Sequence, residues 1–214
     1  MKIPEIKDKR TLYRKLAAAA ALVFLATLGT LLARHLNLGP ERAVPDFRHT
    51  GPADAPIVIE EFTDFACPAC RHAFSGLEEI TKTYPDKVRV VFKHYPLLSL
   101  HPWGVETAVR ADCAGRQGKF KEYAALIFEN QKDWAMSREP QPKLDAYAAQ
   151  AGVDMAVFAA CLDDPEIARQ VSGDMAEGDM RGINATPTFF VNGKRAVGFG
   201  QLVEKIRPLI ITLK

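Results

Sequence analysis

The chain beyond residue 15 lacks any excess of positive charge. Six of the 28 Lys and Arg residues and two of the 26 Asp and Glu residues lie in residues 1–15, which leaves 22 basic and 24 acidic residues in the remainder. The formal net charge of +2 therefore belongs to the N-terminal flank. A basic surface on the folded part is not supported, and we expect no nucleic-acid partner.

Internal repeats and low-complexity segments are also missing, apart from one alanine-rich run. The 48% of hydrophobic and 25% of charged residues are ordinary for a globular protein, so the composition does not indicate disorder. Cysteine is scarce, and the four cysteines are Cys67, Cys70, Cys113 and Cys161. An even number, with none before the apolar run, agrees with export into an oxidising compartment.

A single long apolar run, LAAAAALVFLATLGTLLA, occupies residues 16–33 without a charge or a proline. As a helix it spans roughly 27 Å, close to the thickness of a bilayer core. We expect a single-pass anchor in the cytoplasmic (inner) membrane, with the basic flank 1–15 inside and the remainder in the periplasm or another extracytoplasmic space. A cleaved signal segment and a buried soluble helix stay open as alternatives, although Leu31 to Arg34 matches a cleavage site poorly.

The rest of the chain divides into a linker and one folded domain. Residues 34–56 are rich in Pro and Gly without an apolar period, which predicts a tether, and the domain follows at 57–214. IVIEEF at 57–62 and KVRVVFKHY at 87–95 favour strands, and the segment between them favours a helix that ends at Tyr84-Pro85. This order predicts a βαβ unit with parallel strands.

The second half is predicted to be helical before it returns to strands. Apolar residues recur at helical spacing from about 101 to 183. Asn192-Gly193 lies between two β-rich runs in residues 187–199, which is typical of a two-residue hairpin turn. Residues 201–213 predict a closing helix, with Pro208 as a possible kink.

The motif Cys67-Pro68-Ala69-Cys70 lies where the first strand passes into the first helix. Pro68 suits the first helical position, which places Cys67 at the cap, where free N–H groups and the helix dipole stabilise a thiolate. Cys70 follows one turn later on the same face, close enough to form a short disulfide. We therefore predict an attacking sulfur at Cys67 and a shielded resolving sulfur at Cys70.

Two simpler interpretations explain the motif less well. A zinc site normally needs four ligands, and the remaining His and Cys residues show no second pair at metal spacing, so we expect no metal. A purely structural disulfide over so short a loop restrains little chain entropy. Redox chemistry is the preferred interpretation.

Three segments together resemble the DsbA-like branch of the thioredoxin superfamily, which comprises exported thiol:disulfide oxidoreductases. They are DAPIVIEEFTDFACPACRHAF, VVFKHYPL and GINATPTFFVNG, in the family's order within residues 45–214. The resemblance implies an α/β thioredoxin fold with a helical insertion at about 100–183. It also implies that Cys67 attacks, that Cys70 resolves, and that Pro187 is a cis-proline facing them.

The resemblance also identifies residues around the cysteines. A cis bond before Pro187 would expose the backbone of Thr186 for pairing with an extended client segment, so Thr186, with Pro68 and Ala69, is predicted to contact substrate. The alternative is that Thr186-Pro187 only begins a strand. The family has an acidic residue at the position of Glu61, and we expect Glu61 to shuttle the proton of Cys70 with Lys93 as its partner. A solvent-exposed Glu61 at a sheet edge is the alternative.

The sequence departs from the DsbA type at two positions. Ala69 stands where that type has a histidine, and Thr186 often corresponds to a valine. A missing cationic neighbour predicts a less stabilised Cys67 thiolate and a weaker oxidant, unless His72 or His94 compensates.

Cys113 and Cys161 lie on apolar stripes of the helical segment. We expect a structural disulfide between them because the compartment is oxidising, with two buried free thiols as the alternative.

The overall prediction is an extracytoplasmic enzyme that donates the Cys67–Cys70 disulfide to reduced exported proteins and is reoxidised by a membrane partner. It needs no bound cofactor, because the disulfide itself carries the two electrons. A reductase or isomerase with the same residues, and a peptide-binding or chaperone module without redox turnover, are the alternatives.

Overall fold

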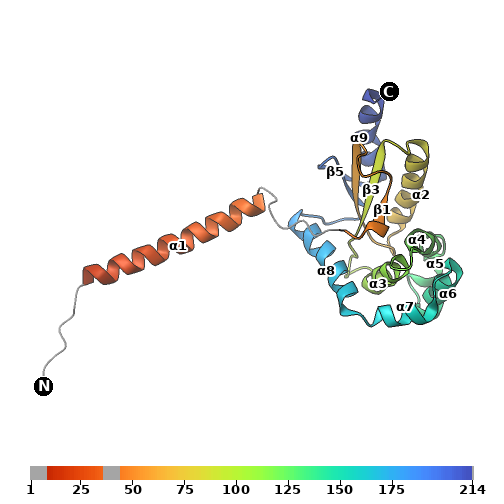
Figure 1. Cartoon of the computed structure of the whole chain (residues 1–214), viewed down its shortest axis with the longest axis horizontal. Coiled ribbons are helices and arrows are strands. Elements are labelled where there is room, and N and C mark those ends of the chain that lie inside the picture. Colours follow the sequence, from red (N-terminus) through yellow and green to blue (C-terminus); the bar gives the residue numbers. More distant parts are fainter. Residues whose placement is uncertain (1–8, 36–43, 214) are drawn as a thin grey trace, which may run out of the picture. The chain divides into compact units, whose positions relative to one another are not determined.

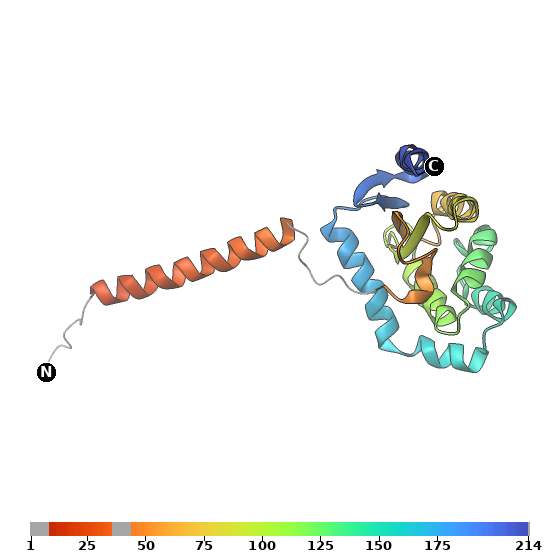
Figure 2. The ribbon, with the colours of Figure 1, turned by 45° about the horizontal axis from the view of Figure 1, so that its top comes forward.

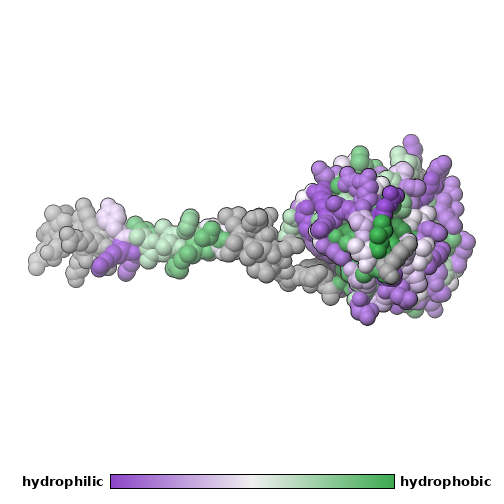
Figure 3. All heavy atoms as spheres, turned by 90° about the horizontal axis from the view of Figure 1, so that it is seen from above, coloured by the Kyte–Doolittle hydropathy of each residue, from purple (hydrophilic) through white to green (hydrophobic). Residues whose placement is uncertain are grey.

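The computed structural model describes residues 9–35 and 44–213, in two compact units that divide after Ala43. In the first unit, residues 9–35 form the helix α1 (Lys9–His35). The side chains described along α1 are mainly hydrophobic (Figure 3), and among them Leu22, Val23 and Phe24 are exposed. In the described ranges, no helix combines the length and the apolar character needed to cross a membrane, so the anchor predicted at 16–33 is not supported.

The second unit is built on a mixed sheet with the strand order β1-β3-β2-β4-β5 (Figure 1). The parallel pair β2–β3 confirms the predicted βαβ unit, and the other neighbours are antiparallel. The strands are β1 (His49–Thr50), β2 (Ile57–Thr63), β3 (Val88–His94), β4 (Thr188–Val191) and β5 (Lys194–Val197).

Helices cover both faces of this sheet. α2 (Pro68–Thr83) and α9 (Gly198–Thr212) pack together on one face, and α8 (Pro165–Met180) lies against β3 on the other (Figure 2). The strand residues Ile57 and Ile59 point toward α2, where they form one core with Leu77. Alternation along β2 therefore sends its odd-numbered residues under the helix that carries the cysteine motif.

The helical insertion lies between β3 and β4, as predicted. Its core surrounds the buried side chains of Tyr123, Trp134 and Phe158 and is continuous with Cys70 of α2 and Phe92 of β3. A disulfide joins Cys113 on α3 to Cys161 on α7. Besides α8, the insertion contains α3 (Gly104–Gly115), α4 (Phe120–Glu129), α5 (Gln131–Trp134), α6 (Gln141–Ala151) and α7 (Met155–Leu162).

The β4–β5 hairpin has the predicted turn at Asn192-Gly193. Both residues have positive φ, 45° and 78°, which is the geometry that favours Asn and Gly in such turns. The Asn192 side chain also accepts a hydrogen bond from Val58 N, which ties the turn to β2.

The tether predicted over 34–56 is wrong for its second half. Residues 36–43 lie outside the described part, but Asp46–Arg48 forms a 3₁₀ turn and His49–Thr50 forms β1, so the folded unit begins at Val44 rather than at residue 57. The buried Arg48 binds the carboxylates of Asp112 and Asp174, 64 and 126 residues away. No local periodicity in the sequence could have indicated such distant contacts.

Candidate active site

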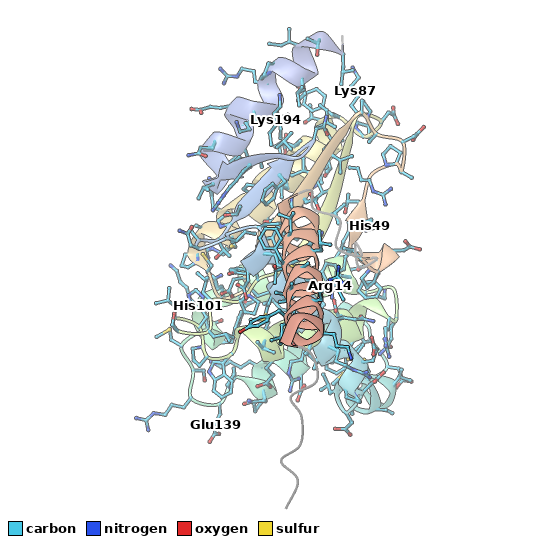
Figure 4. The ribbon with its side chains drawn as sticks, turned by 90° about the vertical axis from the view of Figure 1, so that its left-hand side faces the viewer. Arg14, His49, Lys87, His101, Glu139 and Lys194 are labelled. Atoms are coloured by element: carbon cyan, nitrogen blue, oxygen red, sulfur yellow. A yellow bond between two sulfur atoms is a disulfide. The ribbon has the colours of Figure 1, made fainter. Side chains whose placement is uncertain are left out.

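The cysteine motif lies at the carboxyl end of β2, at the start of α2. Figure 4 shows Lys87 and His101, which flank β3, at opposite ends of the sheet, and the motif lies at the His101 end. Cys67 caps α2 with an extended backbone, and Pro68 is the first helical residue. The Cys67 carbonyl accepts hydrogen bonds from the N–H groups of Cys70 and Arg71, which closes the first turn beneath the sulfur.

The two thiols have different surroundings. Cys67 is 8% exposed and Cys70 is fully buried, while Pro68 and Ala69 between them are exposed. A hydrogen bond from the Cys70 thiol, with smaller contributions from the backbone N–H groups of Cys70 and Ala69, lowers the pKa of Cys67 to about 5. Burial and the adjacent Cys67 raise the pKa of Cys70 well above its ordinary value. The pair thus combines a stabilised outer thiolate with a protonated inner thiol.

Thr186 and Pro187 lie opposite Cys67, although they follow it by more than a hundred residues. The Thr186–Pro187 peptide bond is cis, as the resemblance implies. In its protonated form the Cys67 thiol donates to the Thr186 carbonyl oxygen over 3.5 Å. Thr186 is partly exposed, and its backbone lies beside Cys67, the less buried of the two cysteines of the motif.

Glu61 lies on the α2 side of β2 and is 1% exposed, which excludes the alternative of a solvent-exposed edge residue. Neither carboxyl oxygen has a hydrogen-bond partner in the described part of the chain. Burial raises the pKa of Glu61 to about 8, against a small opposing effect of the Thr63 hydroxyl. The carboxyl also borders a cavity of about 310 Å³ between α2, β3 and the Phe47–Arg48 turn.

Lys93 is not the partner of Glu61, and that prediction is wrong. Lys93 pairs in register with Phe62, so its side chain emerges on the other face of the sheet. There its ammonium binds Glu177 at 2.6 Å and Glu60 at 3.0 Å. Successive side chains of a strand point to opposite faces of the sheet, and it is Glu60 rather than Glu61 that lies on the same face as Lys93.

The two histidines considered as substitutes for a cationic motif residue have other contacts. His94 Nε2 lies 3.0 Å from Asp112 Oδ1 within the buried network around Arg48. The His72 ring packs edge-on against Phe199. Neither contact involves Cys67.

Two residues that the sequence analysis missed hold the motif in place. Gln131 on α5 donates from its side-chain amide to the carbonyl oxygens of Phe65 and Cys67, at 2.7 and 3.0 Å. The buried Asp64 accepts hydrogen bonds from Leu97 N and from His101 Nδ1, at 2.8 and 2.6 Å. The sequence could have indicated a role for Asp64, because it is an acidic residue three positions before Cys67. Nothing in the sequence indicated a role for Gln131.

Within the described residues, no group of three or more His, Cys, Asp or Glu side chains is arranged to hold a metal ion.

The comparisons with known proteins agree with this geometry. A family model described as thioredoxin matches residues 44–205. In the solved structures, DsbA1 (alpha-DsbA1) of Wolbachia pipientis superposes with a TM-score of 0.67 at 21% identity and covers 85% of this chain and 100% of its own. Oxidised BdbD of Bacillus subtilis gives a TM-score of 0.64 at 23% identity, with 75% and 91% covered.

The curated relatives are much longer proteins. A Na(+)/H(+) antiporter NhaA of Herminiimonas arsenicoxydans is 36% identical over 155 residues, which are 72% of this chain and 24% of the antiporter. The chain spans about a quarter of the length of the curated relatives it matches. The name antiporter refers to ion transport by those whole proteins. The thioredoxin match covers well over half of this chain and includes the motif, so the chain belongs to the thioredoxin family, and it shares its fold with DsbA1 and BdbD.

Proposed function

We propose that this chain donates its Cys67–Cys70 disulfide to client proteins. The observation that supports this most directly is the position of Cys67, whose sulfur lies at the start of α2, with a lowered pKa, beside the Thr186 carbonyl. A client thiolate attacks the Cys67 sulfur, the bond to Cys70 breaks, and a client–Cys67 mixed disulfide forms. A second client thiolate then attacks the client sulfur and releases Cys67 as a thiolate, so two electrons pass from the client to the motif.

The proposed direction of electron transfer, from client to motif, rests on the stability of the Cys67 thiolate that is released when the disulfide is reduced. A low pKa for Cys67 favours the reduced motif and makes the disulfide a stronger oxidant. Ala69 removes a cationic neighbour, but the hydrogen bond from Cys70 and the helix N–H groups supply stabilisation that needs no histidine. This supports a donor over a reductase.

Client recognition is proposed to use the backbone beside Cys67. An extended client segment would pair with the main chain at Thr186, a mode that depends little on side-chain sequence. Pro68 and Ala69, both exposed, would form the rim that such a segment crosses.

Glu61 is proposed to exchange the proton of Cys70. Cys70 leaves as a buried thiolate when the disulfide is attacked, and a buried anion without a partner is costly. Glu61, whose pKa is raised to about 8, holds a proton at neutral pH, and its side chain lies on the face of β2 that packs against α2, the helix that carries Cys70. The adjoining cavity of about 310 Å³ would let the carboxyl recover its proton from water.

The compartment and the partners are proposals of the same kind. The buried Cys113–Cys161 disulfide is typical of an oxidising, extracytoplasmic space. The clients would be reduced exported proteins, and a separate membrane protein would reoxidise the motif. The Cys67–Cys70 disulfide would serve as the electron carrier, without a bound cofactor or metal.

The test is the reduction potential of Cys67–Cys70 in the full chain, equilibrated with glutathione, with Cys113 and Cys161 followed separately by mass. A value toward roughly −120 mV is expected for a donor, whereas a value near or below roughly −270 mV would overturn donation in favour of reduction. Cys70→Ser should accumulate a client mixed disulfide and Cys67→Ser should not. Client binding without any exchange would instead support a chaperone module.

A further inference from the structure

Three polar groups lie in a row beneath the first turn of α2. Glu61 and Thr63 are two residues apart on β2, so they share the face on which Ile57 and Ile59 pack against α2. Cys70 projects from α2 onto the end of the same strand, where its sulfur accepts a hydrogen bond from Asp64 N at 3.4 Å. Thr63 therefore stands between the carboxyl and the inner thiol.

The hydroxyl of Thr63 is buried, and no described residue forms a hydrogen bond with it. Thr63 is 1% exposed, and its Oγ1, like both carboxyl oxygens of Glu61, completes no hydrogen bond of ordinary geometry within the described residues. Burying such a group has a free-energy cost, which native proteins rarely leave uncompensated. The hydroxyl nevertheless lies close enough to Glu61 and Cys70 to favour the anion of each, so it opposes part of the rise that burial causes in both pKa values.

The cavity beside Glu61 does not reach the inner thiol. It is lined by Glu61 and by side chains such as Phe74 and Leu77, but neither Thr63 nor Cys70 is among the described residues that border it. Water in this cavity can exchange a proton with the carboxyl, but the remaining distance to Cys70 needs another carrier.

We propose that the Thr63 hydroxyl is the proton bridge between Glu61 and Cys70, which rests on the disulfide exchange proposed above. When the client thiolate breaks the S–S bond, Cys70 leaves with the electron pair of that bond. It takes the proton of the Thr63 hydroxyl, and Thr63 takes the proton of the Glu61 carboxyl. Cys70 ends as a thiol, Thr63 regains its hydroxyl, and Glu61 becomes a carboxylate that is reprotonated from the cavity.

A hydroxyl suits this position because it donates and accepts at the same time. The position itself is firmly held: Thr63 pairs in register with His94, and its carbonyl accepts from Tyr95 N at 2.7 Å. The branched side chain restricts rotation, so the oxygen stays between its two neighbours.

The test compares Thr63→Val, Thr63→Ser and Glu61→Gln with the unmodified chain. The rate of reduction of the Cys67–Cys70 disulfide by a synthetic dithiol peptide is measured from pH 5 to 9 by acid quenching and alkylation. We expect Thr63→Val to slow the reaction roughly tenfold or more at neutral pH and to abolish the inflection near pH 8. Thr63→Ser should restore both, and adding Thr63→Val to Glu61→Gln should slow the reaction no further.

Stability provides a readout that separates a relay from a structural role. Thr63→Val removes an unpaired buried hydroxyl, so the variant should unfold at the same or a higher urea concentration while it reacts more slowly. The matched control is Thr107→Val in α3, where the buried hydroxyl donates to Trp103 O at 2.8 Å. That variant should unfold at lower urea and react at the unmodified rate.

The outcomes distinguish the two proposals. An unmodified chain that shows no exchange would overturn the proposed function. Normal exchange that Glu61→Gln slows but Thr63→Val leaves unchanged would overturn the Thr63 bridge alone. A slow Thr63→Val variant that Thr63→Ser does not rescue would also overturn it, because packing rather than the hydroxyl would then be responsible.

Discussion

Lys93 lies on the face of the sheet opposite Glu61, because it pairs in register with Phe62. Its ammonium is surrounded by Glu60 and Glu177 and lies 5.4 Å from the centre of the Phe62 ring. Lys93 therefore acts on stability, while Glu61 is available for the chemistry of the cysteines.

Lys93→Met is expected to lower the free energy of unfolding by roughly 2 kcal/mol, below the usual cost of breaking a buried ion pair, because Arg181 still binds both carboxylates. Urea unfolding measures this change. The pH dependence of disulfide exchange should stay as in the unmodified chain. If Lys93→Met shifted that pH profile as Glu61→Gln does, Lys93 would act on Glu61 after all.

Glu61 should make the oxidised protein less stable as the pH rises from about 4.5 to about 8. Its folded-state pKa is raised, so in this range the folded state keeps a proton that the unfolded state has lost. Stability is full below the unfolded pKa and decreases toward the folded one, by on the order of 4 kcal/mol.

The measurement is urea unfolding of the oxidised protein and of Glu61→Gln across this pH range. The oxidised form is needed because the lowered pKa of Cys67 gives the reduced form the opposite slope: its stability rises with pH above about 5. The difference in unfolding free energy between variant and unmodified chain should grow with pH. A constant difference would show that Glu61 titrates normally.

The Cys67 thiolate should form with a midpoint of about pH 5 in the reduced protein. Its ultraviolet absorbance, or its rate of alkylation, measures the titration. Cys70→Ala removes the largest cause of the low pKa, so the midpoint should move toward that of an ordinary thiol, about 8.5. An unchanged midpoint in Cys70→Ala would assign the stabilisation to the helix N–H groups instead.

Arg48→Met should lower the free energy of unfolding by about 3–5 kcal/mol, because it removes the guanidinium that binds the buried carboxylates of Asp112 and Asp174. Arg116→Met is the matched control. Arg116 binds Asp164 at the surface, where solvent screens the pair, so its loss should change stability far less than the loss of Arg48. Equal effects of the two variants would contradict the structural role assigned to residues 44–50.

Much of this site could be predicted because the residues that form it are close together in the sequence. Cys67, Pro68 and Cys70 lie within four residues, and their strand-to-helix position follows from local apolar periodicity. Asn192-Gly193 likewise indicates its turn by itself, because few other residues adopt positive φ there.

The remaining features depend on tertiary pairing. Whether Lys93 or Phe92 lies opposite Glu61 depends on a one-residue register between β2 and β3 that alternation alone leaves open. The partners of Arg48 lie on α3 and α8, far along the chain, so the Pro- and Gly-rich sequence around Arg48 by itself indicated a linker. Apolar length alone predicted a membrane anchor at 16–33, which the structure does not support.

The side-chain amide of Gln131 links the helical insertion to the loop that carries the cysteine motif. Its hydrogen bonds to the carbonyls of Phe65 and Cys67 come from the helical insertion, yet they fix the loop that carries the reactive sulfur. Excising the insertion, or exchanging it for that of a relative, would leave both carbonyls without these donors. The insertion and the sheet therefore form a single unit as far as the position of the reactive sulfur is concerned.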